Sequence, residues 1–422
     1  MSKNSKNLRV GIFALSFPTP SETFIVTKVL GLLRAGFDVQ IFTIWPSPYW
    51  DRFTVLASWP DIRQRIHCAP PTRPLWKMLT RGSWQLITKA LTHPVAFMRF
   101  LGHNWRTRQE NYVGFWRGLF RRLPFIGETL DILHVEFDTQ GLGVADLKSF
   151  LKCRLLLSSR GTFQRTGVPD RFPGVYDYLF RYVDGYHFIS RYLRTNTYSL
   201  GLNPDVRNWL IAPAINLDLF VPKPNKPLRS PDAPFRIVSV GRLGWEKGYE
   251  FGLDAVAQVR DAGIPLEYSI VGEGPYVEAL IFAAGQRGLL QNGLVRFVGA
   301  VTQEVLLGYY LKADVMLHPA IDEGFCNAVI EAQAMELPVV TSDAGGLPEN
   351  VENELTGFVV PRRDPDAMAQ KLLQLSLDPK LCRQLGRAGR QRVLKHFDIS
   401  NQVDEFVSLY EELAASELEQ TA

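Results

Sequence analysis

The sequence predicts an α/β protein made of two doubly wound domains with parallel sheets. Short apolar strands alternate with helices along both halves of the chain, which favours parallel sheets. A length of 422 residues is too great for one ordinary core. The segment 222–234 contains five prolines, which exclude a helix or a central strand. We therefore expect this segment to be a linker between two domains.

The first domain is expected to span residues 1–221. Its strands are expected at 8–15, 37–44, 131–137, 154–158 and 185–189, and the segment 210–215 ends it. Ser21 can cap a helix that runs to Arg34 and stops at Gly36.

The second domain is expected to span residues 235–400, and a final helix follows over 401–422. Strands are expected at 236–240, 267–271, 295–298, 315–318 and 339–341, with helices at 249–262, 276–287, 302–311 and 327–335. Doubly wound sheets bind ligands at the carboxyl ends of their strands. The loops that follow these strands are therefore the places to look for a site.

The cysteines and the apolar segments indicate a cytoplasmic protein. Cys68, Cys153, Cys326 and Cys382 are far apart, which argues against a zinc site or a disulfide framework and fits a reducing compartment. No apolar stretch approaches the roughly 20 residues of a transmembrane helix. The run 10–15 is too short for a signal peptide. A net charge of +4 gives little information about partners.

Residues 73–122 form a basic and aromatic region. They contain ten lysines and arginines and one acidic residue, Glu110, with large aromatic side chains between them. This composition fits a peripheral contact with an anionic membrane surface. An ordinary helical insertion whose aromatics pack on the sheet is the alternative, and nucleic acid is not the expected partner.

Two glycine-bearing loops follow strands in the second domain. The first carries Gly241, Arg242 and Lys247 before a helix, an arrangement that suits the phosphates of an anionic ligand. The second carries Gly272 and Gly274, where the backbone can approach a planar ligand. Both patterns also occur in plain turns, and the second lacks the GxGxxG spacing of a dinucleotide site.

A third loop carries two carboxylates. Glu323 follows a strand, and Glu331 lies near the start of the helix that Asn327 is expected to cap. Carboxylates accept hydrogen bonds from sugar and ribose hydroxyls, and the backbone amides from Gly324 to Asn327 are open to a ligand. The alternative is a helix whose acidic first turn complements the helix dipole.

Two further patterns lie in the second domain. Gly345 and Gly346 follow another strand, so four loops capable of binding a ligand are expected at one sheet edge. Asp364 and Asp366 form a DxD pattern, which binds metal in some transferases. Because a helix follows directly, we interpret it as a helix cap and expect no metal site.

These motifs resemble glycosyltransferase family 4, whose members are retaining enzymes of the GT-B fold. The strongest match is the E-x7-E element from Glu323 to Glu331 and its continuation to residue 349. The loops at 240–247 and 271–275 and the segment 356–358 fit as well. In the first domain, residues 17–25 resemble bacterial exopolysaccharide enzymes of the colanic-acid type. The resemblance covers most of the chain and is looser between residues 45 and 200.

The resemblance implies two Rossmann-like domains that face each other across a cleft, with the final helix crossing back to the first domain. It also implies roles for individual residues. Arg242 and Lys247 would hold the donor diphosphate and stabilise it as leaving group without a metal, and Glu331 would bind the ribose. Glu323, with the amides of Gly324 and Phe325, would hold the donor sugar. The remaining residues implied at the donor site are Gly241, Gly272, Gly274, Cys326 and Asn327.

The resemblance weakens on the side of the acceptor. Arg160 stands where family members commonly have a histidine, and Glu136 stands where many have a second one. Arginine stays protonated and cannot be a general base, but it can bind a sugar or an anionic acceptor. Ser21 and Glu22 complete the residues expected on this side.

The function expected from the sequence is a retaining, metal-independent glycosyltransferase of the hexosyltransferase type. Its co-substrate would be a UDP- or GDP-linked sugar, and its acceptor a lipid-linked intermediate or a polysaccharide. It would need no cofactor and would act in the cytoplasm, in peripheral contact with the inner face of the membrane. The alternatives are a sugar-nucleotide epimerase or phosphorylase on the same fold, and a non-catalytic nucleotide-sugar-binding module.

Overall fold

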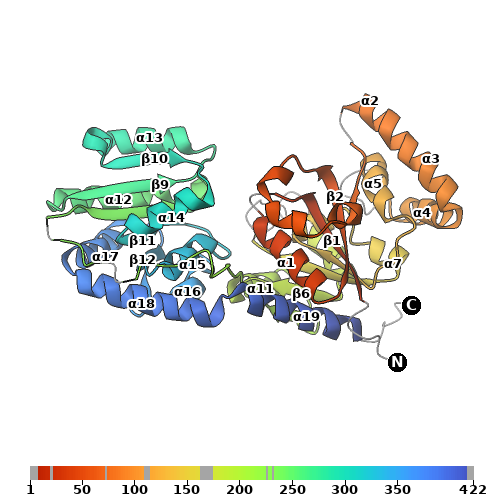
Figure 1. Ribbon diagram of the computed structural model, residues 1–422. Helices are drawn as coiled ribbons and strands as arrows, with labels where there is room; N and C mark the ends of the chain where they lie inside the picture. Colours follow the sequence, from red (N-terminus) through yellow and green to blue (C-terminus); the bar gives the residue numbers. More distant parts are fainter. Residues whose placement is uncertain are drawn as a thin grey trace. The chain divides into compact units, whose positions relative to one another are not determined.

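The computed structural model describes residues 8–19, 22–71, 74–108, 115–161, 174–224, 227–230 and 232–415. The chain forms two compact units (Figure 1). Unit 1 comprises Met1–Ile189, Leu193–Ile211 and Val403–Ala422, and unit 2 comprises Ser190–Tyr192 and Ala212–Gln402. Each unit is built on one parallel sheet, so the predicted fold class is confirmed.

Unit 1 has a seven-stranded sheet in the order β3-β2-β1-β4-β5-β6-β7, with all neighbours parallel. The strands are β1 (Arg9–Phe17), β2 (Asp38–Pro46), β3 (Ile66–Cys68), β4 (Ile132–Val135), β5 (Arg154–Ser159), β6 (Gly185–Phe188) and β7 (Arg207–Leu210). The helices are α1 (Thr23–Arg34), α6 (Asp138–Gly141), α7 (Leu147–Leu151), α10 (Val175–Tyr182), α11 (Arg191–Ser199) and α19 (Ile399–Ala415).

The core of unit 1 joins distant parts of the sequence. Val10 and Ile12 of β1 share one cluster of buried side chains with Val29 of α1 and with Phe406 and Leu409 of α19. The final helix therefore completes the core of unit 1, although its first residues belong to unit 2.

Helix α1 ends as the sequence predicts. The amide of Gly36 donates to the carbonyl of Leu33, and the amide of Phe37 donates to the carbonyl of Leu32. This pair of hydrogen bonds closes the last turn of a helix that ends at a glycine. At the other end of α1 the expectation was wrong, because the N-cap is Glu22 and not Ser21. Ser21 itself lies outside the described residues.

The basic region of unit 1 is helical where it is described. It contains α2 (Leu75–Lys77), a π-helical turn (Met78–Gly82), α3 (Ser83–Thr92), α4 (Pro94–Arg106) and α5 (Phe115–Arg122). Figure 1 shows α2 and α3 as one long helix that turns back into α4. Among the described helices of the chain, none combines the length and the apolar character needed to span a bilayer.

Unit 2 has a six-stranded parallel sheet in the order β10-β9-β8-β11-β12-β13. The strands are β8 (Phe235–Val240), β9 (Leu266–Val271), β10 (Val295–Gly299), β11 (Val315–His318), β12 (Val339–Ser342) and β13 (Gly357–Val360). The helices are α12 (Tyr249–Asp261), α13 (Val277–Gln286), α14 (Gln303–Lys312), α15 (Asn327–Ala334), α16 (Leu347–Asn350), α17 (Pro365–Leu377) and α18 (Pro379–His396).

The DxD pattern has the structural role that the sequence predicts. Asp364 is the N-cap of α17, and its carboxylate accepts a hydrogen bond from the amide of Ala367. Asp366 lies in the first turn and accepts a hydrogen bond from Gln258 of α12.

Three short strands were not predicted. β3, β7 and β13 have only three or four residues each. β7 lies before the segment 210–215 that was expected to end the first domain, and the units divide after Ile211. The exposed and partly buried side chains of β7 do not give the buried apolar run by which longer strands are recognised.

Candidate functional site

The candidate donor site lies in unit 2, at the carboxyl ends of the strands. Hydrogen bonds join the loop after β8 to the loop after β9, since the amide of Leu243 donates to the carbonyl of Glu273 at 2.9 Å. The amides of Ile321 and Gly346 donate to the carbonyls of Glu246 and Glu323, at 2.9 and 2.8 Å. The four loops therefore form one connected rim.

Glycine is required where these loops touch. A Cβ atom on Gly272 would collide with the carbonyl oxygen of Gly241. Gly345 has a φ of +57°, and a Cβ atom there would collide with the carbonyl oxygen of Glu323. The glycines thus hold the loops together, and the same residues leave backbone open to a ligand.

An open pocket borders the second loop. It is lined by Gly272, Glu273 and Gly274, and by Val298 and Gly299 from the end of β10. Bare backbone and apolar side chains at a strand end suit one face of a flat ring.

An ion pair lies where the first and third loops meet. Lys247, in a 3-10 turn before α12, pairs its ammonium with the Glu323 carboxylate. Both side chains are largely buried, with 13% and 7% of their surface exposed. Arg242 differs, because its side chain is 67% exposed while it pairs with the buried Glu246. The loop therefore presents one accessible guanidinium beside a fixed ammonium.

One buried neighbour of Glu323, His318, was missed by the sequence analysis. His318 ends β11, and its Nε2 lies 3.5 Å from a Glu323 oxygen, while its Nδ1 lies 3.9 Å from the Cys326 sulfur. Burial alone would lower the pKa of His318, but Cys326 and Glu323 raise it to about 9. A protonated His318 and the Lys247 ammonium thus both face the Glu323 carboxylate at neutral pH.

His318, Glu323 and Cys326 are also the only group of three within the described residues whose ligand atoms are close enough to share a metal ion. Thiolate, imidazole and carboxylate together suit zinc. However, the Glu323 carboxylate is already paired with the Lys247 ammonium. We therefore assign no metal to this group.

Glu331 lies in the second turn of α15 and is partly buried. The hydroxyl of Tyr310 donates to its carboxylate at 2.9 Å. Desolvation raises the pKa of Glu331 to about 7, and the Tyr310 hydrogen bond opposes part of that rise. The carboxylate therefore changes charge near neutral pH.

The start of α15 corrects one expectation. Asn327 is not the cap, because the helix begins at Asn327 and its N-cap is Cys326. Asn350 of α16 makes the hydrogen bonds, since its amide group accepts from the Cys326 amide and donates to the Cys326 carbonyl, both at 3.1 Å. Gly324 and Phe325 precede this cap, and both are buried.

In unit 1, Glu136 and Arg160 come together at the ends of β4 and β5. The Glu136 carboxylate is buried between the Lys28 ammonium and the Arg160 guanidinium, which lies 3.0 Å away. Burial would raise the pKa of Glu136, but the two cations lower it below its ordinary value. Lys28, on α1, was not predicted, and burial lowers its pKa to about 8.

Histidines extend this cluster into the core. His134 lies 2.7 Å from the hydroxyl of Ser158 and 2.6 Å from that of Tyr410 in α19. Ser158 lies 2.7 Å from His187. Burial lowers the pKa of both histidines well below its ordinary value, so they are neutral hydrogen-bonding groups.

Arg160 is fixed from two sides. Its Nε donates to the Glu136 carbonyl at 3.1 Å, and its guanidinium lies 3.8 Å from the ring centre of Phe24. Glu22 precedes α1 and accepts a hydrogen bond from Thr19, and burial raises the pKa of Glu22. The structure thus gathers Glu22, Glu136 and Arg160, and Ser21 lies outside the described residues.

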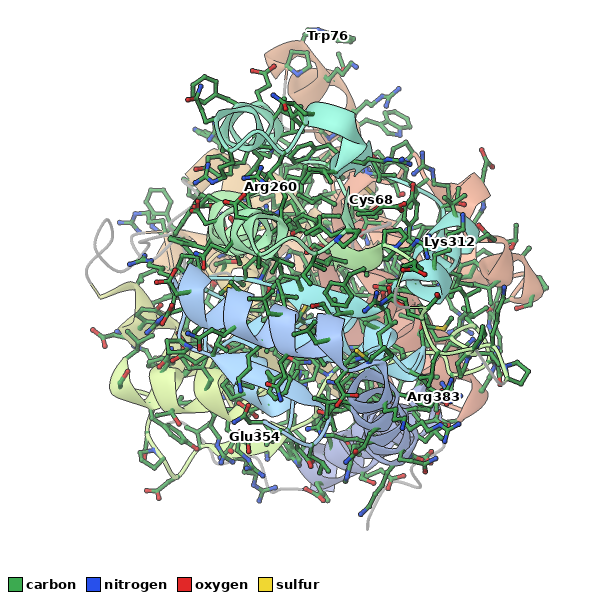
Figure 2. The ribbon with its side chains drawn as sticks, turned by 90° about the vertical axis from the view of Figure 1, so that its left-hand side faces the viewer. Cys68, Trp76, Arg260, Lys312, Glu354 and Arg383 are labelled. Carbon is green, nitrogen blue, oxygen red and sulfur yellow. The ribbon has the colours of Figure 1, made fainter. Side chains whose placement is uncertain are left out.

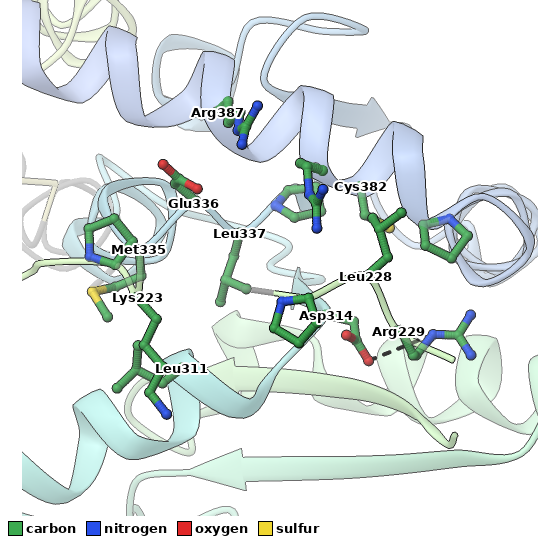
Figure 3. Close-up of a pocket in the computed structure, with 15 residues that line it drawn as sticks. Lys223, Leu228, Arg229, Leu311, Asp314, Met335, Glu336, Leu337, Cys382 and Arg387 are labelled. Carbon is green, nitrogen blue, oxygen red and sulfur yellow. Dashed lines mark ion pairs between the residues drawn. The ribbon is translucent and has the colours of Figure 1, made fainter. Parts of the chain in front are cut away.

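A separate pocket opens at the amino ends of β11 and β12 (Figure 3). Asp314 and Arg229 lie 3.9 Å apart on its wall, and Leu337 contributes to its apolar lining. This pocket is at the sheet edge opposite the four loops. Its lining contains no residue of the four loops, so we do not assign the donor site to it.

The chain is similar to known glycosyltransferases. Residues 222–392 match the family model described as Glycosyl transferases group 1. The chain is 26% identical over 410 residues to the putative colanic acid biosynthesis glycosyltransferase WcaL of Escherichia coli (strain K12), covering 93% of this chain and 96% of the relative. It is 26% identical over 382 residues to the amylovoran biosynthesis glycosyltransferase AmsK of Erwinia amylovora, covering 87% and 91%.

Among solved structures, Anabaena HepE in complex with UDP is similar with a TM-score of 0.68. The match covers 96% of this chain and 100% of that chain at 15% sequence identity. At this identity the likeness shows a shared GT-B fold.

Proposed function

Because residues 222–392 form a group 1 glycosyl transferase domain and the chain is homologous to the colanic acid and amylovoran glycosyltransferases, we propose that it is a retaining, metal-independent hexosyltransferase. It moves a sugar from a nucleoside diphosphate sugar to a lipid-linked or polysaccharide acceptor in exopolysaccharide or cell-envelope glycan synthesis. The observation that carries this proposal is the buried Lys247–Glu323 pair beside the exposed Arg242, at the strand ends of unit 2.

The proposed donor roles follow from charge. Arg242 offers a guanidinium fork to the diphosphate, and Lys247 adds a compact charge next to the bond that breaks. Positive groups fixed at this position stabilise the departing diphosphate, which is the work a metal ion does in other transferases. Glu331 accepts hydrogen bonds from the ribose hydroxyls. The pocket at Gly272 and Gly274 receives the base, with UDP or GDP as the nucleotide.

In the proposed mechanism, the bond between the anomeric carbon and the phosphate oxygen breaks, and the acceptor oxygen bonds to the same face of the sugar. The acceptor proton passes to the departing phosphate oxygen. Glu323 and the amides of Gly324 and Phe325 hold the sugar during this step. A covalent bond to Glu323 is the less favoured route, because the carboxylate is already paired with Lys247.

The proposed place of action is the cytoplasm, in peripheral contact with the inner face of the membrane through residues 73–122. On the acceptor side, we propose that Glu22 and Arg160 contact the acceptor and that Glu136 positions Arg160. UDP is supported by the fold shared with HepE, whose structure holds UDP. An epimerase or phosphorylase is the second candidate, since such enzymes use the same fold, and analysis of the reaction products separates them from a transferase.

A thermal-shift screen tests the donor site first. We expect UDP or GDP to raise the Tm of the intact chain, because a ligand that binds only the folded state stabilises it. The Arg242→Ala variant should lose this shift. Arg236→Ala is the matched control, since Arg236 is also a half-exposed, ion-paired arginine of unit 2. No shift with UDP, GDP, ADP or their sugars would argue against a working donor site.

The pKa of Glu331 gives a second expected result. Folding raises this pKa from 4.5 to about 7, so the carboxyl group costs stability as the pH rises through that window. We expect Glu331→Gln to raise the free energy of unfolding by about 1–2 kcal/mol at pH 8, seen as a higher Tm. Near pH 4.5 both quantities should be unchanged.

The same substitution should weaken nucleotide binding at pH 8, because an amide oxygen is a poorer acceptor for ribose hydroxyls than a carboxylate. Calorimetric titration of UDP and GDP at both pH values measures this. Glu267→Gln is the control, since Glu267 lies on the surface of the same unit with 45% of its side chain exposed. If the variant binds nucleotide as tightly as the parent does, Glu331 does not bind the ribose.

A further inference from the structure

Helix α3 carries an apolar stripe on its outer side. Trp84, Ile87 and Leu91 recur at helical spacing, and 71%, 51% and 78% of their surfaces are exposed. None of the described side chains of α3 is fully buried. The π-helical turn and α2 precede this stripe, and Trp76, labelled in Figure 2, is 62% exposed at their start.

Helix α4 has two apolar sides. Phe97 and Phe100 are buried, and Phe100 packs against Phe150 of α7, which attaches the helix to the body of unit 1. Val95 and Met98 lie on the other side, with 74% and 66% of their surfaces exposed. A helix that only covered a core would need one apolar side. The second side is therefore available for an apolar partner.

The surroundings of this exposed surface are positively charged. Between Asp61 and Glu110 the sequence has no acidic residue. Arg81, Arg99 and Arg106 are exposed on the π-helical turn and on α4. Neither a protein core nor a neutral partner would select cations alone around an apolar stripe. An anionic lipid surface accounts for both the cations and the apolar stripe, because its headgroups attract arginine and its acyl chains take up the apolar side chains.

We propose that Trp84, Ile87, Leu91, Val95 and Met98, here called the hairpin face, insert into the interface of an anionic bilayer. Arg81, Arg99 and Arg106 would then lie among the lipid phosphates. This inference deepens the proposed function, on whose membrane location it rests, and it selects a lipid-linked acceptor over a free polysaccharide. Tryptophan suits the boundary between headgroups and acyl chains, where its ring is apolar and its N–H remains hydrated.

Sedimentation of the intact chain with lipid vesicles tests this inference. We expect binding to phosphatidylcholine vesicles that contain phosphatidylglycerol and much weaker binding to phosphatidylcholine alone. Leu91→Gln should weaken binding roughly tenfold, since burying a leucine side chain is worth about that factor or more. Arg81→Gln should weaken it about fivefold in the phosphatidylglycerol vesicles only, since each basic residue near such a surface contributes about that factor.

Leu377→Gln is the matched control, because Leu377 lies on a helix of unit 2 and is 73% exposed, close to the 78% of Leu91. Equal binding by the two leucine variants would overturn the inference. So would a chain that binds no vesicles but self-associates through Leu91, since the hairpin face would then be a protein interface.

The nucleotide thermal shift of the same samples separates this failure from a failure of the proposed function. A chain that is stabilised by UDP or GDP and does not bind vesicles keeps its donor site, but loses the membrane inference together with the proposed membrane location. A chain that binds vesicles but is stabilised by neither UDP nor GDP would support the membrane inference and contradict the transferase proposal.

Discussion

Lys247→Ala is expected to lower kcat about 10²–10³-fold, the usual cost of removing one fixed group that stabilises charge in a transition state. The ammonium of Lys247 is held by Glu323 and is largely shielded from water, so its charge is not strongly screened. The effect should fall mainly on kcat, because charge on the departing diphosphate grows as the bond breaks. Release of UDP or GDP from the sugar donor, with a membrane extract as acceptor source, measures the rate.

Lys312→Ala is the control for this experiment. Lys312 is an exposed lysine at the end of α14 in the same unit, and it should tolerate the change without loss of rate. Lys247→Arg should recover only part of the rate, because a planar guanidinium cannot take the place of a compact ammonium in a closely packed pair. A Lys247→Ala enzyme that keeps the parent rate would show that the diphosphate leaves without this charge.

The sequence predicted that four loops share one sheet edge, and the structure has this arrangement, because the relevant spacing is local. Each motif directly follows a strand of a parallel sheet, and the carboxyl ends of such strands share one edge. Alternation alone therefore places Lys247, Gly272, Glu323 and Gly345 on one rim. The structure adds the hydrogen bonds that connect these loops, which the pattern of apolar and polar residues in the sequence does not predict.

What the sequence could not predict depends on contacts between distant residues. Cys326 is the N-cap of α15, and Asn350, 24 residues away, accepts a hydrogen bond from its amide, so the local rule that favoured Asn327 was wrong. Tyr410 meets His134 across 276 residues, and only the path of the final helix brings them together. One local signal was available, since Lys28 lies on the apolar side of α1 among Ile25 and Val29. A charge at such a position indicates a buried partner.

Glu136, the buried partner of Lys28, gives the largest expected effect on stability. Glu136→Gln leaves the Lys28 ammonium and the Arg160 guanidinium beside each other without their shared carboxylate. Breaking a buried ion pair from one side costs about 3–5 kcal/mol, because an uncompensated charge stays in the interior. We expect a fall in the free energy of unfolding of this size at pH 7, measured by denaturant titration. Glu128→Gln is the control, since Glu128 pairs with Arg9 at a more exposed site and should lose about 1 kcal/mol or less.

The pH dependence identifies the cause of this loss. Folding lowers the pKa of Lys28 from 10.5 to about 8, so the unfolded chain binds more protons between these values and stability rises with pH there. The deficit of Glu136→Gln should therefore be greatest below pH 8 and shrink as Lys28 releases its proton. Adding Lys28→Met should recover part of the loss at pH 7, because it removes one of the two stranded cations. If the deficit stays the same from pH 7 to 10 and Lys28→Met restores nothing, packing around Glu136, and not its charge, holds this cluster together.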